Sequence, residues 1–101
     1  MNFNTSKIFD YTIKKIQRGY PLNQIVYQKF DDELIVEWNH GKLHIERQDN
    51  GKFIVEYFHE LYPKYDMEFY EVNPYHLIRA IDYIYARIDF DLNKTPPSKL
   101  Y

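Results

Sequence analysis

The sequence QIVYQKFDDELIVEWNHGKLHIERQDNGKFIVEYF, residues 24–58, decides the fold. Four short apolar runs in this stretch are separated by turn-forming residues at Asp31-Asp32, His40-Gly41 and Asp49-Asn50-Gly51. Apolar runs of strand length that are bounded by such turns pair with their neighbours in sequence. The stretch therefore predicts a four-stranded antiparallel meander.

The register of the central hairpin follows from which apolar side chains share a face. Side chains alternate along a strand, so a shift by one residue moves every side chain to the other face. A two-residue loop at His40-Gly41 sets Trp38 opposite Leu43. Val36 is then expected opposite Ile45.

The third turn requires a longer loop. A three-residue loop with Gly51 in the left-handed conformation sets Ile45 opposite Val55 and Leu43 opposite Tyr57. A two-residue loop would instead oppose an apolar residue and a glutamate, so we expect the three-residue loop.

The first turn completes one apolar face. Carried back through Asp31-Asp32, the register sets Ile25 opposite Trp38 and Tyr27 opposite Val36. We call this side of the sheet face one. Its expected members are Ile25, Tyr27, Leu34, Val36, Trp38, Leu43, Ile45, Phe53, Val55 and Tyr57.

The opposite side, face two, mixes apolar residues with charged ones. Its expected members are Val26, Phe30, Ile35, Ile54, Phe58, Glu33, Glu37, His44, Glu46 and Glu56. Two interpretations are open. Face two is either a solvated outer face with a few residues of high strand propensity, or an acidic surface with apolar anchors. With two helices expected, both lie on face one or one covers each face.

Residues 4–19 carry the signature of a helix. Asn4, Thr5 or Ser6 caps its start, and residues 18–21 stop it at a glycine and a proline. The apolar residues at helical spacing are Ile8, Phe9, Ile13 and Ile16. Its cations are Lys7, Lys14, Lys15 and Arg18.

A second helix is expected after a fifth strand. Residues 66–71 alternate in polarity and predict a fifth strand at an edge of the sheet. Asn73 is a good N-cap and Pro74 suits the first helical position. One apolar stripe runs from there towards Asp89 and packs on the sheet. Its members are Leu77, Ile78, Ile81, Ile84, Tyr85 and Ile88.

Length and composition predict one α+β domain over residues 1–91 and a mobile tail over residues 92–101. The chain has 101 residues, 45% of them hydrophobic. Cysteine is absent, which excludes disulfides and thiolate chemistry and suits a reducing compartment. No segment has the pattern of a membrane span or signal peptide, so we expect a cytoplasmic protein.

Charge is distributed unevenly behind a formal net charge of −2. Residues 1–30 hold five cations and one acid, whereas residues 31–91 hold six cations and fourteen acids. Such an asymmetry biases which partners approach which side of a molecule.

Few residues suggest a catalytic, phosphate-binding or metal site. His40 and His44 are four apart, but that spacing spans a turn and a strand, so it does not predict a metal pair. His59-Glu60 and His76 with Arg79 lack a nucleophile with an orienting third group, and no glycine-rich phosphate loop is present. We therefore expect neither an enzyme nor a cofactor or metal site.

The expected function is protein binding without catalysis. The chain shares its type, small, cysteine-free, acidic and α+β, with phage inhibitors, anti-restriction and anti-CRISPR proteins and toxin-immunity proteins. The mechanism would be occlusion of a nucleic-acid enzyme, with carboxylates in place of phosphates and aromatic anchors. The expected partner-binding residues are Asp31, Asp32, Glu33, Glu37, Glu46, Glu56, Tyr62, Tyr65 and Tyr70.

Two alternatives remain open. The first is a nucleic-acid-binding protein that uses Lys7, Lys14, Lys15 and Arg18, although four cations without a recognition motif form a weak footprint. The second is a homodimeric structural domain that buries face two against its own copy.

Overall fold

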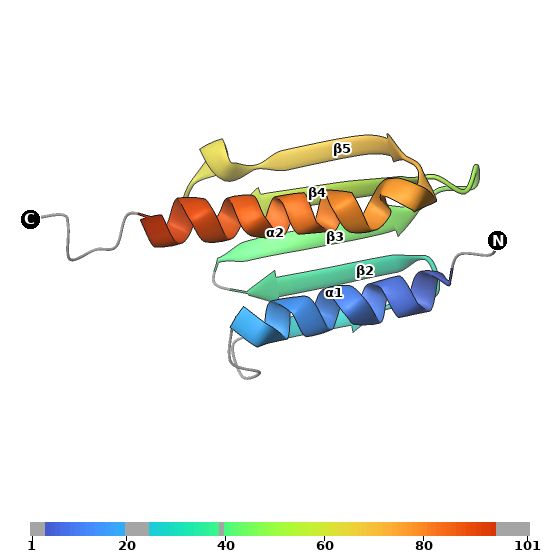
Figure 1. The fold of residues 1–101 in the computed structure, drawn as a ribbon, viewed down its shortest axis with the longest axis horizontal. Coiled ribbons are helices and arrows are strands. Elements are labelled where there is room, and N and C mark those ends of the chain that lie inside the picture. The colour runs from blue at the N-terminus through green and yellow to red at the C-terminus, as the bar shows by residue number, and fades with distance from the viewer. Residues whose placement is uncertain (1–3, 20–24, 39, 95–101) are drawn as a thin grey trace, which may run out of the picture.

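A computed structural model describes residues 4–19, 25–38 and 40–94, with only the backbone described for residues 88–94. Over these residues the fold is α+β, with two α-helices and a five-stranded sheet (Figure 1). The helices are α1 (Thr5–Gly19) and α2 (Leu77–Lys94). The strands are β1 (Ile25–Lys29), β2 (Glu33–Trp38), β3 (Gly41–Arg47), β4 (Phe53–His59) and β5 (Met67–Val72). Short 3-10 turns, η2 (Pro63–Tyr65) and η3 (Pro74–His76), flank β5.

The five strands form one antiparallel meander in the order β1-β2-β3-β4-β5. This confirms the predicted meander and the predicted fifth strand, which lies at an edge. The pairing of β4 with β5 is interrupted by a bulge, where Glu71 takes a left-handed φ of 57°. A bulge at an edge strand hinders further strand addition.

The third hairpin has the predicted register. Ile45 lies opposite Val55 and Leu43 opposite Tyr57. Gly51 has a φ of 83°, and its N–H donates to the carbonyl of Gln48 at 2.9 Å. The left-handed glycine inserts one extra residue in the turn, which brings the apolar sets of both strands to the same face.

The first hairpin also has the predicted register. Ile25 lies opposite Trp38 and Tyr27 opposite Val36. Tyr27 lies on face one as predicted but remains 49% exposed, so it is not part of the core. It lies on an edge strand, which has a neighbouring strand on one side only.

The predicted register of the second hairpin is wrong by two residues. Trp38 lies opposite Gly41 and Val36 opposite Leu43, so Gly41 is the first residue of β3 and not part of the turn. The left-handed position falls on His40, with a φ of 67°. A glycine is required at the strand position because a Cβ on Gly41 would collide with the ring of Tyr57. A shift of two residues keeps every side chain on its predicted face.

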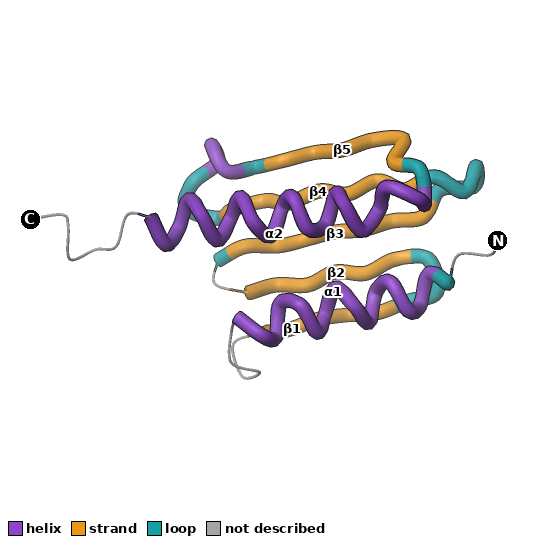
Figure 2. The backbone as a smooth tube through the Cα atoms, in the orientation of Figure 1, coloured by secondary structure: helices purple, strands orange, loops and turns teal. Residues whose placement is uncertain are grey.

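Both helices pack on face one, as Figures 1 and 2 show. The alternative with one helix on each face is wrong. The core joins the apolar stripes of α1 and α2 to the inward side chains of the sheet. The buried apolar helix residues are Ile8, Phe9, Ile13 and Ile16 of α1 and Leu77, Ile81 and Ile84 of α2. Ile78, expected in the stripe of α2, is 39% exposed, and the side chain of Ile88 lies outside the described residues.

Both predicted caps are present, although Asn73 caps the 3-10 turn η3 and α2 itself begins at Leu77. The side chain of Asn4 accepts a hydrogen bond from the Lys7 N–H at 3.1 Å. Asn73 accepts one from the Tyr75 N–H at 2.9 Å, with Pro74 following it, and the chain passes through η3 into α2. These caps satisfy backbone donors that have no partner inside a helix.

Helix α2 continues to Lys94, beyond the predicted ends at Asp89 and Asp91. Asn93 and Lys94 keep their backbone N–H groups, so neither forces a helix to stop as a proline does. The rest of the predicted tail, residues 95–101, lies outside the described residues. None of the described helices is long and apolar enough to cross a membrane.

Candidate functional site

The side chains of face two form rows that cross the sheet. The first row follows the pairs Val26 with Glu37, Glu37 with Lys42 and Lys42 with Phe58. It is polar in the middle and apolar at both ends. Val26 is 63% exposed and Phe58 37% exposed, so the apolar ends face solvent.

The second row carries the ionisable centre of face two. It contains Gln28, Ile35, His44, Glu56 and Glu68, one from each strand. The third row contains Glu33 opposite Glu46 and Glu46 opposite Ile54. No described helix covers any of these rows, because α1 and α2 both lie on face one (Figure 1).

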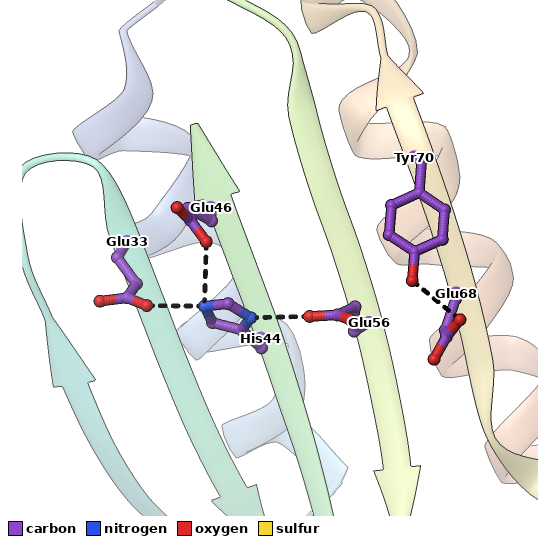
Figure 3. A network of polar contacts seen from close by, with 6 residues as sticks. All are labelled: Glu33, His44, Glu46, Glu56, Glu68 and Tyr70. Atoms are coloured by element: carbon purple, nitrogen blue, oxygen red, sulfur yellow. Dashed lines mark hydrogen bonds and ion pairs between the residues drawn. The ribbon is translucent and has the colours of Figure 1, made fainter. Parts of the chain in front are cut away.

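His44 connects carboxylates from three strands (Figure 3). Its Nε2 lies 2.7 Å from an oxygen of Glu33 on β2, and its Nδ1 lies 3.0 Å from an oxygen of Glu56 on β4. Glu46, two residues along β3, has an oxygen 3.9 Å from Nε2. The imidazole is mostly shielded, with 18% of its side-chain surface exposed.

The environment raises the pKa of His44 above its ordinary value. Burial alone lowers this pKa, because it disfavours the charged form. The hydrogen bonds to Glu56 and Glu33, and the charges of both carboxylates, act in the opposite direction and outweigh burial. In the protonated form both ring nitrogens donate, one to each glutamate.

Two pairs of glutamates lie directly opposite each other on face two. Glu33 is paired with Glu46 across β2 and β3, and Glu56 with Glu68 across β4 and β5. Like charges in direct cross-strand opposition destabilise a sheet. Tyr70 donates its hydroxyl to Glu68 at 2.9 Å, and this hydrogen bond raises the pKa of Tyr70. The remaining repulsion favours a positively charged group near this surface.

A shallow hollow of about 510 Å³ opens at the end of face two where β2 turns into β3. Val26 and Phe58 line it together with Glu37 and Lys42, which are the four members of the first row. The hollow therefore combines apolar walls with charged groups.

Five of the predicted partner-binding residues come together on face two. These are Glu33, Glu37, Glu46, Glu56 and Tyr70. Asp31 and Asp32 lie in the turn next to Glu33, and Asp32 forms an ion pair of 3.2 Å with Arg47.

The structure does not bring Tyr62 and Tyr65 together with these carboxylates. The two tyrosines flank His59 at the far end of β4, with ring centroids 5.1 and 5.7 Å from the imidazole. The 3-10 turn η2 (Pro63–Tyr65) bends the chain there, and Tyr65 packs partly against the core.

His59 is a structural residue. Its Nδ1 accepts hydrogen bonds from the backbone N–H groups of Leu61 and Tyr62, at 3.1 and 3.0 Å. Burial, and then the neighbouring His40, lower the pKa of His59. Only a neutral imidazole offers an acceptor nitrogen, so the loop after β4 depends on the neutral form.

The basic helix is only partly available to a partner. Lys15 forms an ion pair of 3.4 Å with Asp82 of α2, and its ammonium lies 5.1 Å from the ring centroid of Tyr85. It therefore joins the two helices instead of facing solvent. Lys7, Lys14 and Arg18 are exposed.

His44 is the central residue that the sequence analysis did not identify as part of the site. The alternation of strand residues places it on face two with four glutamates. The predicted register, however, sets His44 opposite Glu37, whereas the structure sets it opposite Ile35 and diagonal to Glu33. Glu68 was missed because residues 66–71 did not show which strand they pair with.

Comparisons with known proteins add no family to this description. Neither a protein-family model, nor a curated protein, nor a solved structure matches the chain.

Proposed function

We propose that the protein binds another protein without catalysis, and that face two docks on a basic surface of a nucleic-acid enzyme. The role would be that of an inhibitor or immunity protein encoded by a phage or mobile element. The observation that carries this proposal is an acidic sheet face that none of the described elements covers.

The charge of face two supports a basic partner. Its described residues include the glutamates at positions 33, 37, 46, 56 and 68 and one cation, Lys42. Facing charges of opposite sign accelerate association and exclude partners of like charge. A groove that binds phosphates offers the complementary cations.

Apolar side chains at the margins of face two would be buried when a partner binds. Val26 and Phe58 end the first row, exposed Phe30 lines a hollow with Glu33 and Glu46, and exposed Tyr70 contacts Glu68. Aromatic residues in such positions account for much of the affinity at protein interfaces. Carboxylates would therefore set orientation and rate, and these anchors would slow dissociation.

The test begins with recovery of a partner from host lysate and continues with the purified pair. Inhibition of the partner's activity is measured with the wild-type protein, with Glu37→Lys/Glu68→Lys, and with Asp49→Lys. Neither Glu37 nor Glu68 contacts His44 in the structure. A lysine at position 68 would face Glu56, whereas one at position 37 would face Lys42, so a melting curve first establishes that the double variant is folded. Asp49→Lys is the matched control, because it reverses an exposed charge in a turn outside face two.

We expect the double variant to inhibit at least tenfold more weakly and to associate more slowly, while Asp49→Lys inhibits as the wild type does. Affinity should fall as salt rises, because exposed charges more than about 10 Å apart are largely screened at 0.1 M. Equal inhibition by the wild type and the double variant would refute docking through face two.

The purified protein also tests the two alternative functions, nucleic-acid binding and self-association. Salt-sensitive retardation of bare DNA that disappears in Lys14→Glu/Arg18→Glu would replace the proposal with nucleic-acid binding through α1. A concentration-dependent dimer that Phe58→Asp dissociates would replace it with self-association through face two.

A further inference from the structure

We propose that Glu33, His44 and Glu46 form a binding site for a divalent transition-metal ion on face two. This goes beyond the proposed function and departs from the sequence-based expectation of no metal site. It does not depend on a protein partner, so it is testable with the metal alone.

The donor atoms have the chemistry of a transition-metal site. One oxygen of Glu33, one oxygen of Glu46 and Nε2 of His44 all lie within 4.8 Å of one another. Imidazole suits zinc and similar ions, whereas calcium and magnesium prefer oxygen ligands alone. The imidazole therefore distinguishes this cluster from a group of surface acids.

The spacing of these atoms suits a small ion. Zinc lies about 2.0–2.2 Å from nitrogen and oxygen ligands, which places the ligands of a tetrahedral site roughly 3.3 Å apart. The Nε2 of His44 lies 2.7 Å from Glu33 and 3.9 Å from Glu46, which brackets that value. Both glutamates are half-exposed, so their side chains have room to rotate towards one ion.

The strands hold the three ligands on one side of the sheet. His44 and Glu46 are two residues apart on β3, so both point to face two. Glu33 lies directly opposite Glu46 on β2. A divalent cation between these two carboxylates would neutralise their charges and remove their cross-strand repulsion.

Glu56 acts as a positioning residue for His44. Its oxygen lies 3.0 Å from Nδ1, so with a metal on Nε2 the Nδ1–H donates to Glu56. A carboxylate in this position fixes the tautomer and orientation of a ligating histidine and makes it a better ligand. The bound ion replaces the Nε2 proton that otherwise bonds to Glu33.

The experiment titrates the purified full-length chain with Zn²⁺ by calorimetry and with Co²⁺ by visible absorption. We expect one ion per chain and a Co²⁺ spectrum of low coordination number. Glu33→Gln, His44→Gln and Glu46→Gln should each weaken Zn²⁺ binding at least tenfold. Glu37→Gln removes a carboxylate from the same strand and face as Glu33 and should leave binding unchanged.

Glu56→Gln separates positioning from ligation. We expect about 10- to 100-fold weaker Zn²⁺ binding, as for other carboxylates that orient a ligating histidine. The Co²⁺ spectrum should keep its shape, because the three ligands remain. A change in that shape would show that Glu56 is itself a ligand and would overturn its positioning role.

Three results would overturn the site. They are the absence of Zn²⁺ binding, equal weakening by Glu37→Gln and Glu33→Gln, and Ca²⁺ binding as tight as Zn²⁺ binding with no effect of His44→Gln. The last two would indicate only general attraction of cations to an acidic face. Melting curves without metal establish whether each variant folds. If His44→Gln does not fold, Glu33→Gln and Glu46→Gln carry the test.

Discussion

Replacement of Gly41 by alanine tests the register of the central hairpin. A Cβ on Gly41 would lie 2.8 Å from both Cε1 and Cζ of Tyr57, and closer still to its hydroxyl oxygen. Carbon atoms in favourable contact are about 3.5–4.0 Å apart, so the ring or the strand must move by roughly 0.7 Å or more. Overpacking of this kind costs about 1–3 kcal/mol.

The cost should depend on the ring of Tyr57. In a Tyr57→Leu background the obstructing ring is absent. Alanine should then be neutral or stabilise by up to about 1 kcal/mol, because glycine is unfavourable inside a strand. The double-mutant cycle should therefore give a coupling free energy of roughly 1–3 kcal/mol. Tyr57→Phe keeps the ring and removes only the hydroxyl, so most of the cost should remain in that background.

The assay is urea unfolding followed by far-ultraviolet circular dichroism, with unchanged m-values as the condition for comparing variants. His40→Gly is the companion control. Its left-handed φ of 67° suits glycine, so we expect stability within about 0.5 kcal/mol of the wild type. An equal cost of Gly41→Ala in the wild-type and Tyr57→Leu backgrounds would refute the reasoning. That result would mean that Gly41 is required for its own backbone conformation, as in the register predicted from sequence.

Three further predictions concern stability. Gly51→Val should lower the free energy of unfolding by roughly 1 kcal/mol or more, because φ is 83° and a β-branched residue is strained there. A Cβ would meet nothing within 4 Å, so the effect comes from the backbone alone, and an unchanged melting temperature would contradict the turn. Trp38→Ala should cost on the order of 3 kcal/mol or more, since Trp38 is 4% exposed, and red-shifted native fluorescence in the wild type would contradict its burial. The pKa of His59 is lower in the folded chain than in the unfolded chain, whose histidine titrates at about pH 6.5. Below that pH the unfolded chain binds more protons at this residue, so the free energy of unfolding should fall as pH drops towards the folded pKa. His59→Asn should remove that contribution to the pH dependence of urea unfolding, and identical pH profiles for variant and wild type would show that the neutral form is not required.

The sequence by itself determined the elements and the faces. Turn residues and strand alternation are local signals, so the first and third hairpins, and the side chains that belong to face one, were predicted correctly. Asn4 and Asn73 signalled the helix starts for the same reason, because a cap depends on residues within one turn. The carboxylates that β2, β3 and β4 place on face two followed from alternation alone, whereas Glu68 of β5 did not.

The tertiary structure decided the register of the second hairpin and the position of both helices. A shift of two residues leaves the faces unchanged, so the apolar pattern does not distinguish the two registers. In the observed register Gly41 lies against the Tyr57 ring of the next strand, a contact between strands that the apolar pattern does not reveal. Likewise, Lys15 looks free in the sequence of α1, and only the packing of α2 brings Asp82 to it.

The centre of the candidate site was also decided in three dimensions. His44, Glu33 and Glu56 belong to three strands, and their contacts depend on the register of two hairpins at once. The sequence predicts that these side chains share a face, because side chains alternate between the two faces along each strand. Which of them meet is set by how neighbouring strands slide past each other, and that depends on side-chain packing far away in the sequence.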